Sequence, residues 1–329
     1  MAKNDMKFVA PKLEELLGKK VYYVDEVYGS KVEETWANLK DGEVMLIQNT
    51  RYIKGETKND YELAKELAKN KDVFVMDAFG SAHRSHSSTY GVAEILKQEG
   101  KETALGFLME KEVNALSKCV VADEHPYVAV LGGAKVSDKI KVIESLLEKV
   151  DKIIIGGAMA YTFLASKGIE IGNSRVEKEQ LDFAKTCLEK ANGKIILPID
   201  HVCSNDFENP TEIKLCKEGI EEGFMGLDIG VETIELYKNI LSDAKVVFWN
   251  GPMGVFEDSR FSNGTKSICA YIASLTDTFT VIGGGDSAAA SKEFGYKDDF
   301  SHVSTGGGAS LEMIENDGVL PGIEIIEDK

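Results

Sequence analysis

The chain has 329 residues, which is enough for one large or two ordinary domains. Hydrophobic residues make up 43% and charged residues 28%, as in globular proteins, and the net charge of −17 argues against non-specific binding to nucleic acid. No window approaches the roughly 20 apolar residues of a membrane span, and the five cysteines show no paired spacing. These features predict a cytoplasmic protein in a reducing compartment.

The first hundred residues predict few regular units. Short apolar runs at Val21–Val24, Val44–Ile47 and Asp72–Met76 predict strands, and the stretch NDYELAKELAK predicts a helix after an Asn-Asp cap. Residues 108–121 predict a connecting helix, which the polar segment ADEHP follows. We therefore place a domain boundary within residues 108–126.

From about residue 120, short apolar runs alternate with helical stretches. In SDKIKVIESLLEKV the apolar residues follow the i, i+3, i+4, i+7 spacing of one buried helix face. The apolar runs are Tyr127–Leu131, Lys152–Ile155, Lys194–Leu197, Lys245–Trp249 and Phe279–Ile282. Because these runs do not alternate with polar residues, they are typical of strands buried on both faces. The pattern predicts an α/β fold in which helices cover both faces of a parallel sheet.

Glycines follow four of these predicted strands. They lie in VLGGAKVSDK (130–139), IIIGGAMA (153–160), WNGPMGVFE (249–257) and VIGGGDS (281–287). One glycine pair after a strand usually makes only a turn. The carboxyl ends of parallel strands, however, share one edge of the sheet, so the four loops should meet there. Four glycine-rich loops with accessible backbone N–H groups are typical of a phosphate-binding site. The sequence contains neither the G-x-G-x-x-G of dinucleotide-binding folds nor the G-x-x-x-x-G-K-[ST] of Walker loops.

Charged residues accompany two of the glycine loops. Lys135 and Lys139 stand four apart at the predicted opening of a helix, so both can project from one face toward a polyphosphate. Lys139 can equally be a solvated surface lysine. Asp286 follows three glycines at a predicted helix start, where it can cap the helix or hold Mg²⁺ beside phosphate oxygens. Both alternatives stay open for Asp286.

Two basic segments of the first lobe, QNTRYIKGE (48–56) and DAFGSAHRSHSS (77–88), also follow predicted strands. Arg51 and Arg84 can each bind a small phosphate or carboxylate through two N–H groups, or form a surface ion pair. His83 and His86 have H-x-x-H spacing, which without a third ligand is only a weak indication of a metal site.

Nine segments, taken in chain order, resemble those of phosphoglycerate kinases and span nearly the whole chain. They are QNTRYIKGE, DAFGSAHRSHSS, GFLMEKE, LGGAKVSDKI, IIIGGAMAYTF, GFMGLDIG, WNGPMGVFE, IGGGDSAAA and STGGGASLE. The resemblance implies two Rossmann-like lobes with parallel sheets joined by a helical hinge. It implies a glycolytic phosphotransferase that exchanges a phosphoryl group between 1,3-bisphosphoglycerate and Mg-ADP, giving 3-phosphoglycerate and ATP.

The resemblance also implies a division of the chain. Residues 1–107 would form the phosphoglycerate-binding lobe and residues 108–126 the connecting helix and linker. Residues 127–303 would form the nucleotide-binding lobe, and residues 304–329 the hinge and the return to the first lobe.

By resemblance, Arg51 and Arg84 would bind the phosphate of phosphoglycerate, with His83 nearby. Lys135 would stabilise the transferred phosphoryl group, and Lys139 would contact the nucleotide phosphates. The amides of residues 283–285 would bind these phosphates, and Asp286 would hold Mg²⁺. The remaining nucleotide-binding and catalytic residues that the resemblance implies are Gly132, Gly133, Gly156, Gly157, Gly226, Asn250, Pro252, Glu257, Gly283, Gly284, Gly285 and Ser287.

The sequence departs from the family at its start. The family's opening strand, similar to RVDFNVP, and a second strand that ends in SHLGRP have no counterpart, so we expect an incomplete N-terminal lobe. We then expect the nucleotide lobe to fold and bind Mg-ADP or Mg-ATP, while the chain alone turns over poorly or not at all. A monomer is expected once the missing segment is supplied. The alternative hypothesis is a truncated, non-catalytic fragment that binds Mg-nucleotide.

Overall fold

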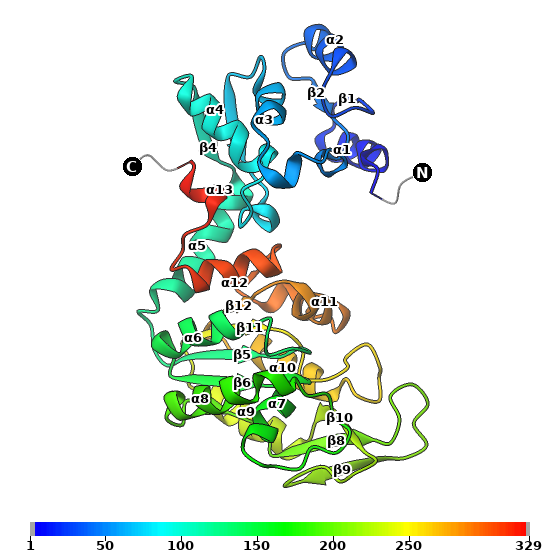
Figure 1. Ribbon diagram of the computed structural model, residues 1–329, viewed down its shortest axis with the longest axis vertical. Helices are drawn as coiled ribbons and strands as arrows, with labels where there is room; N and C mark the ends of the chain where they lie inside the picture. The colour runs from blue at the N-terminus through cyan, green and yellow to red at the C-terminus, as the bar shows by residue number, and fades with distance from the viewer. Residues whose placement is uncertain (1–3, 327–329) are drawn as a thin grey trace. The chain divides into compact units, whose positions relative to one another are not determined.

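A computed structural model describes residues 4–326 (Figure 1). They form two compact units. Unit 1 contains the described residues up to Glu110 and those from Val319 onward, and unit 2 is Lys111–Gly318. No helix among the described residues is long and apolar enough to cross a membrane.

Unit 2 is built on a six-stranded parallel sheet with the strand order β13-β12-β11-β5-β6-β7. The strands are β5 (Tyr127–Leu131), β6 (Lys152–Ile155), β7 (Ile195–Ile196), β11 (Val246–Asn250), β12 (Phe279–Ile282) and β13 (His302–Val303). Every residue of β5 and β11 is buried. The prediction of a parallel sheet made of continuous apolar runs is therefore confirmed.

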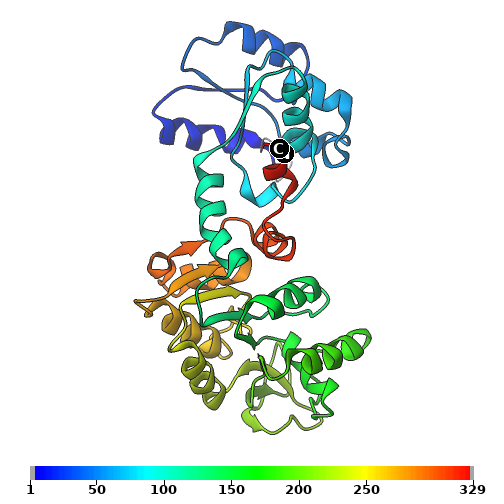
Figure 2. The same ribbon diagram turned by 90° about the vertical axis from the view of Figure 1, so that its left-hand side faces the viewer.

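Helices cover both faces of this sheet (Figures 1 and 2). The helices of unit 2 are α5 (Phe107–Val121, which begins in unit 1), α6 (Ile140–Lys149), α7 (Met159–Ser166), α8 (Leu181–Ala191), α9 (Val231–Leu241), α10 (Asn263–Ala273), α11 (Gly285–Glu293) and α12 (Gly307–Glu315). On one face, Tyr237 of α9 and Ile268 of α10 join Trp249 of β11 in a single buried cluster. On α6, Val142, Ile143 and Leu146 are buried, as the periodicity predicts.

Unit 2 also contains a three-stranded antiparallel sheet that the sequence did not predict. Its order is β10-β8-β9, formed by β8 (Asp200–Ser204), β9 (Ile213–Lys217) and β10 (Met225–Ile229). Strand β9 is mostly exposed and carries lysines between apolar residues, and β10 has an irregular register between Gly226 and Asp228. Such short strands lack the continuous apolar run that identifies a buried parallel strand.

Unit 1 contains two separate two-stranded parallel sheets. They pair β1 (Val21–Tyr23) with β2 (Val44–Leu46), and β3 (Val73–Met76) with β4 (Glu102–Leu105). The predicted strands β1 to β3 are present, each within one residue of the expected bounds. The helices of this unit are α1 (Ala10–Leu17), α2 (Ser30–Asn38), α3 (Tyr61–Ala68), α4 (Val92–Gln98) and α13 (Pro321–Glu324). The backbone N–H of Gly322 in α13 donates to the Ala82 carbonyl at 2.8 Å.

The division between the units differs from the boundaries that the sequence suggested. It falls at 110/111 and 318/319, whereas the sequence analysis placed a linker at 108–126 and a return segment from residue 304. The hydroxyl of Ser145 in α6 donates to the Ile314 carbonyl at 2.9 Å, so α12 belongs to unit 2. Residues 1–3 and 327–329, the ends of the predicted first lobe and return segment, lie outside the described residues.

Candidate functional site

Four glycine-containing loops meet at the carboxyl edge of the parallel sheet, as the sequence predicts. They follow β5, β6, β11 and β12, which are adjacent in the sheet. Backbone hydrogen bonds join them: the N–H of Gly132 donates to the Asn250 carbonyl at 3.0 Å, and that of Gly157 donates to the Met253 carbonyl at 2.9 Å. The Asn250 side chain adds the loop after β12, because its Nδ2 donates to the Gly283 carbonyl at 3.1 Å, so all four loops are in contact.

Several of the predicted glycines are required by this packing between loops. A Cβ at Gly132 would lie 2.1 Å from the Pro252 carbonyl oxygen, and one at Gly156 would lie 2.4 Å from the Met253 Sδ. A Cβ at Gly226 would lie 1.9 Å from the Tyr161 hydroxyl. These glycines permit close approach of neighbouring protein atoms, whereas a Cβ at Gly285 would meet no heavy atom within 4 Å.

Two neighbouring cavities open on this edge. The first, of about 470 Å³, has a mostly apolar wall that includes Tyr161, Met225, Leu227, Met253 and Val255. The second, of about 370 Å³, is lined mainly by glycine backbone, together with two lysines and two aspartates (Lys135, Lys139, Asp138 and Asp286). Both are lined by Gly133, Ala134 and Asp286, so they adjoin. An apolar compartment beside a glycine-rich one that carries lysines and helix N-termini suits a ligand with an aromatic base and phosphates.

The predicted site residues are distributed between these cavities. The first is lined by Gly133, Gly157, Gly226, Pro252, Glu257 and Asp286. The second is lined by Gly132, Gly133, Lys135, Lys139, Asn250, Gly284, Gly285 and Asp286. Gly156, Gly283 and Ser287 line neither cavity among the described residues. The Ser287 hydroxyl is buried, donates to the Gly284 carbonyl at 3.0 Å and accepts from the Gly251 N–H at 3.2 Å, so it stabilises the loops.

Lys139 is buried, so the alternative that it is a solvated surface lysine is wrong. Its Nζ donates to Asn250 Oδ1, and the Asn250 Nδ2 donates to the Gly283 carbonyl at 3.1 Å. Burial lowers the pKa of Lys139 to about 8, against the opposing effect of Asp138 and Asp286. The side-chain amine of Lys139 is thus partly deprotonated near pH 8, and Lys139 lines the second cavity.

Lys135 and Lys139 do not project from one helix face. The prediction made from their four-residue spacing is therefore wrong. Helix α6 begins only at Ile140, and the preceding residues form turns. Lys135 is exposed while Lys139 is buried, although both line the second cavity. The turn is held by Glu177, whose carboxylate accepts from the Val136 N–H at 2.5 Å and from the Ser137 hydroxyl at 2.6 Å.

Helix α11 begins at the second cavity. Its N-cap is Gly284 with φ +79°, and a Cβ there would lie 2.6 Å from the backbone nitrogen of Gly307. Asp286 lies in the first turn of α11, is exposed, and lines both cavities. Its carboxylate makes no hydrogen bond within residues 4–326 that would cap the helix. The Asp286 carboxylate is therefore exposed where the two cavities adjoin.

Sequence reasoning missed further lining residues. Gly307 and Gly308 at the start of α12 line the second cavity, although their segment was assigned to the hinge. Two helix N-termini, those of α11 and α12, thus border one cavity, and both favour anions. A second triple glycine, residues 306–308, was the available signal. Arg175, which lines the first cavity, lies in a loop with no such signal.

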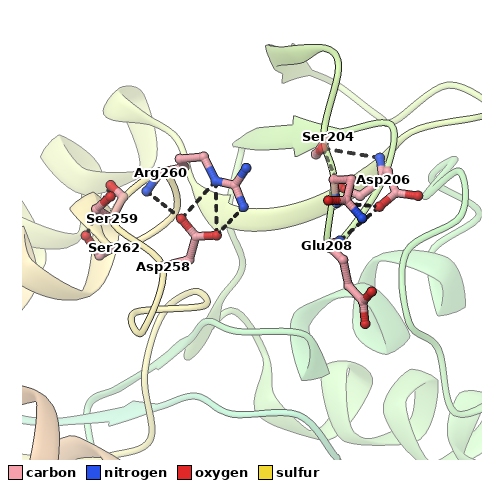
Figure 3. A network of polar contacts seen from close by, with 8 residues as sticks. Ser204, Asp206, Glu208, Asp258, Ser259, Arg260 and Ser262 are labelled. Carbon is pink, nitrogen blue, oxygen red and sulfur yellow. Dashed lines mark hydrogen bonds and ion pairs between the residues drawn. The ribbon is translucent and has the colours of Figure 1, made fainter.

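Figure 3 shows two loops rich in polar contacts, and each contributes a residue to the lining of the first cavity, Phe207 from one and Glu257 from the other. In one, Asp206 Oδ1 accepts from the N–H groups of Glu208 and Asn209 at 2.9 and 2.8 Å. In the other, both carboxylate oxygens of Asp258 accept from the Arg260 guanidinium, at 3.0 Å from Nε. Glu257, the predicted ribose ligand, immediately precedes this ion pair and lines the cavity.

The predicted substrate residues lie in unit 1. Arg51 is exposed on a single turn of 3₁₀ helix (Thr50–Tyr52), and Arg84 is exposed in the segment after β3. Burial lowers the pKa of His86, Glu56 opposes this effect, and Arg51 and Arg84 add to it, so both arginines lie near His86. His83 is half-buried in the same segment. Within the part of the chain that the structure describes, no group of three His, Cys, Asp or Glu residues could hold a metal ion.

Comparisons with known proteins agree with this geometry. A family model described as phosphoglycerate kinase matches residues 1–317. The phosphoglycerate kinase of Thermosipho africanus (strain TCF52B) is 55% identical over 98% of this chain and 80% of its own length. That of Fervidobacterium nodosum (strain ATCC 35602 / DSM 5306 / Rt17-B1) is 53% identical over 99% of this chain and 82% of its own length.

Solved structures show the same likeness. The phosphoglycerate kinase from Coxiella burnetii matches with a TM-score of 0.86 and 38% identity, over 99% of this chain and 82% of that chain. The enzyme from Pyrococcus horikoshii OT3 matches with a TM-score of 0.84 and 34% identity, over 98% of this chain and 82% of that chain. Because nearly all of this chain is matched, the comparisons neither support an incomplete N-terminal lobe nor favour the non-catalytic fragment.

Proposed function

The chain belongs to the phosphoglycerate kinase family, and we propose that it transfers a phosphoryl group reversibly between 1,3-bisphosphoglycerate and Mg-ADP, giving 3-phosphoglycerate and ATP. The observation that supports this proposal for the site is the pair of adjoining cavities, one mostly apolar and one lined by glycine backbone, two lysines and two aspartates. Together they offer separate surroundings for a base and for a chain of phosphates.

The nucleotide base would occupy the first cavity, whose lining includes Gly157, Gly226, Pro252 and Glu257. The phosphates would enter the second cavity, near the N-termini of α11 and α12. Amides at Gly284 and Gly285 would then donate to phosphate oxygens, because unpaired N–H groups at a helix start favour anions.

The chemistry requires charge neutralisation more than proton transfer. The reaction exchanges a phosphoryl group between acidic oxygens, so it needs no strong general base. Lys135, exposed in the second cavity, can accompany the transferred group, while Lys139 can exchange its bond to Asn250 for one to a phosphate. Both roles are electrostatic and depend on position.

The residues present also fit Mg²⁺. This ion prefers one or two carboxylates together with substrate phosphates and water, and Asp286 offers an exposed carboxylate at the phosphate end. Bound there, Mg²⁺ would neutralise phosphate charge. In unit 1, Arg51 and Arg84 would bind the phosphate of phosphoglycerate, with His83 beside them.

We also propose that the enzyme is monomeric and cytoplasmic. All five cysteines are buried and unpaired, as in reducing compartments.

The proposal is tested by turnover of Mg-ATP with 3-phosphoglycerate, measured as the rate of ADP release. We expect Lys135→Met to lower kcat by at least about tenfold, because electrostatic stabilisation of the transferred group is lost. Lys141→Met is the matched control, since Lys141 is exposed on α6 and lines neither cavity among the described residues. Equal activity of the two variants would contradict the assigned role, and no turnover by the wild-type chain would contradict the function.

A further inference from the structure

Arg175 brings a positive charge into the apolar cavity. Among the described residues that line this cavity it is the single lysine or arginine, and the other charged side chains there are Glu257 and Asp286. Arg175 lines the first cavity but not the second, so it lies toward the base rather than the phosphates of the proposed nucleotide. A guanidinium at this place needs an explanation other than phosphate binding.

The backbone on both sides of Arg175 is anchored. Before it, the N–H of Asn173 donates to the Phe224 carbonyl at 2.7 Å, and the Ser174 hydroxyl accepts from the Gly226 N–H at 2.9 Å. After it, the Glu177 N–H donates to the Thr162 hydroxyl at 3.1 Å. The loop therefore holds the start of the Arg175 side chain in a fixed place at the cavity wall.

The guanidinium of Arg175 is available to a ligand. Within residues 4–326 it makes no hydrogen bond, ion pair or ring contact. Arg260 provides the contrast, because its guanidinium is held by both oxygens of Asp258 (Figure 3). An arginine that is positioned through its backbone but lacks a partner retains all five N–H donors for recognition.

On the basis of the proposed function, we propose that Arg175 determines which nucleotide base the enzyme accepts, and that it favours 6-oxopurines. The N7 and O6 atoms of guanine are both acceptors and can receive two parallel N–H groups from one guanidinium. Adenine presents an acceptor at N7 but a donor at N6, so it can receive only one of them. The enzyme should therefore use guanine nucleotides beside adenine nucleotides, through Arg175.

Titration calorimetry with Mg-GDP and Mg-ADP tests this proposal, with turnover of Mg-GTP and Mg-ATP measured in parallel. We expect Arg175→Leu to weaken Mg-GDP binding relative to Mg-ADP by about 5- to 150-fold, the usual value of one bidentate pair. Arg175→Lys keeps the charge but loses the paired donors, so it should lose most of the same preference. Arg260→Leu removes an arginine that is already paired, and should leave the ratio of the two affinities unchanged.

The proposal is overturned if wild-type protein binds Mg-ADP but no Mg-GDP, or if Arg175→Leu weakens both nucleotides by the same factor. Binding ratios decide this point even without turnover. Absence of turnover with both nucleotides, combined with a shifted binding ratio, would instead refute the proposed function and support the role of Arg175. Normal Mg-ATP turnover with an unchanged ratio would refute only the role of Arg175.

Discussion

Lys139 should take up a proton when nucleotide binds. In the free protein its buried Nζ donates to Asn250, and burial lowers its pKa to about 8. Phosphates entering the second cavity would place negative charge beside this amine, and a nearby opposite charge favours the ammonium form. Its pKa should then return toward the ordinary value for lysine, about 10.4.

The size of the effect depends on pH. With a pKa of about 8, free Lys139 is about 90% protonated at pH 7, about half protonated at pH 8 and about 10% protonated at pH 9. Binding should therefore take up about 0.1, 0.5 and 0.9 proton at these three pH values. Because the amine must first be protonated at the higher pH, nucleotide affinity should fall by about fivefold between pH 8 and pH 9.

Calorimetry measures this uptake directly, as the dependence of the binding enthalpy on the ionisation enthalpy of the buffer. Lys139→Met should abolish the uptake at pH 9, while Lys141→Met, on the exposed surface of α6, should retain it. An uptake below about 0.1 proton at pH 9 in the wild type, or an equal uptake in Lys139→Met, would refute the placement of phosphate beside Lys139.

Three further predictions concern the framework around the site. Burial raises the pKa of Asp228 to about 7, so the folded protein retains a proton that the unfolded chain releases near pH 4. The free energy of unfolding should therefore fall by up to about 4 kcal/mol as pH rises from about 4 to 7. Urea titrations should show that this dependence is lost in Asp228→Asn; an unchanged pH dependence would refute it. The buried Glu112 carboxylate accepts hydrogen bonds from His302 and Thr305, all at 2.7 Å. Glu112→Ala should lower the free energy of unfolding by about 3–5 kcal/mol, and a loss below about 1 kcal/mol would contradict a paired buried charge. Gly284→Ala should lower the melting temperature more than Gly285→Ala, because both have positive φ but only Gly284 has a close backbone neighbour; equal losses would contradict this difference.

Five of the six strands of the parallel sheet of unit 2 could be predicted, whereas the two-residue strand β13 could not. Tyr127–Leu131, Lys152–Ile155 and Phe279–Ile282 are strands with the expected bounds. Burial on both faces requires a continuous apolar run, which leaves a clear pattern in the sequence. The meeting of four glycine loops followed from the same step, because parallel strands end at one edge.

The antiparallel sheet could not be predicted in this way. Its strand β8 contains the buried polar residues Asp200 and His201, so it shows no apolar run. The Asp200 carboxylate is satisfied by the Thr233 N–H at 2.8 Å, from a helix that begins 31 residues later. A local sequence pattern cannot predict a hydrogen bond between residues that lie so far apart in the chain.

The lysine pair shows the same limit within the site. The four-residue spacing of Lys135 and Lys139 predicts that both lie on a helix, but helix α6 starts after Lys139. Lys139 is buried because Asn250, 111 residues further along the chain, accepts its hydrogen bond. Arg175 was missed because an isolated arginine in a polar loop has no distinguishing pattern, and only the folded loop places it at the cavity.

The proposed reaction can be measured as the formation of ATP from Mg-ADP. The purified chain should form ATP when 1,3-bisphosphoglycerate is supplied and none when acetyl phosphate replaces it, since the latter lacks the second phosphate that Arg51 and Arg84 are proposed to bind. Binding of Mg-ADP without any ATP formation from 1,3-bisphosphoglycerate would contradict the proposed phosphoryl transfer.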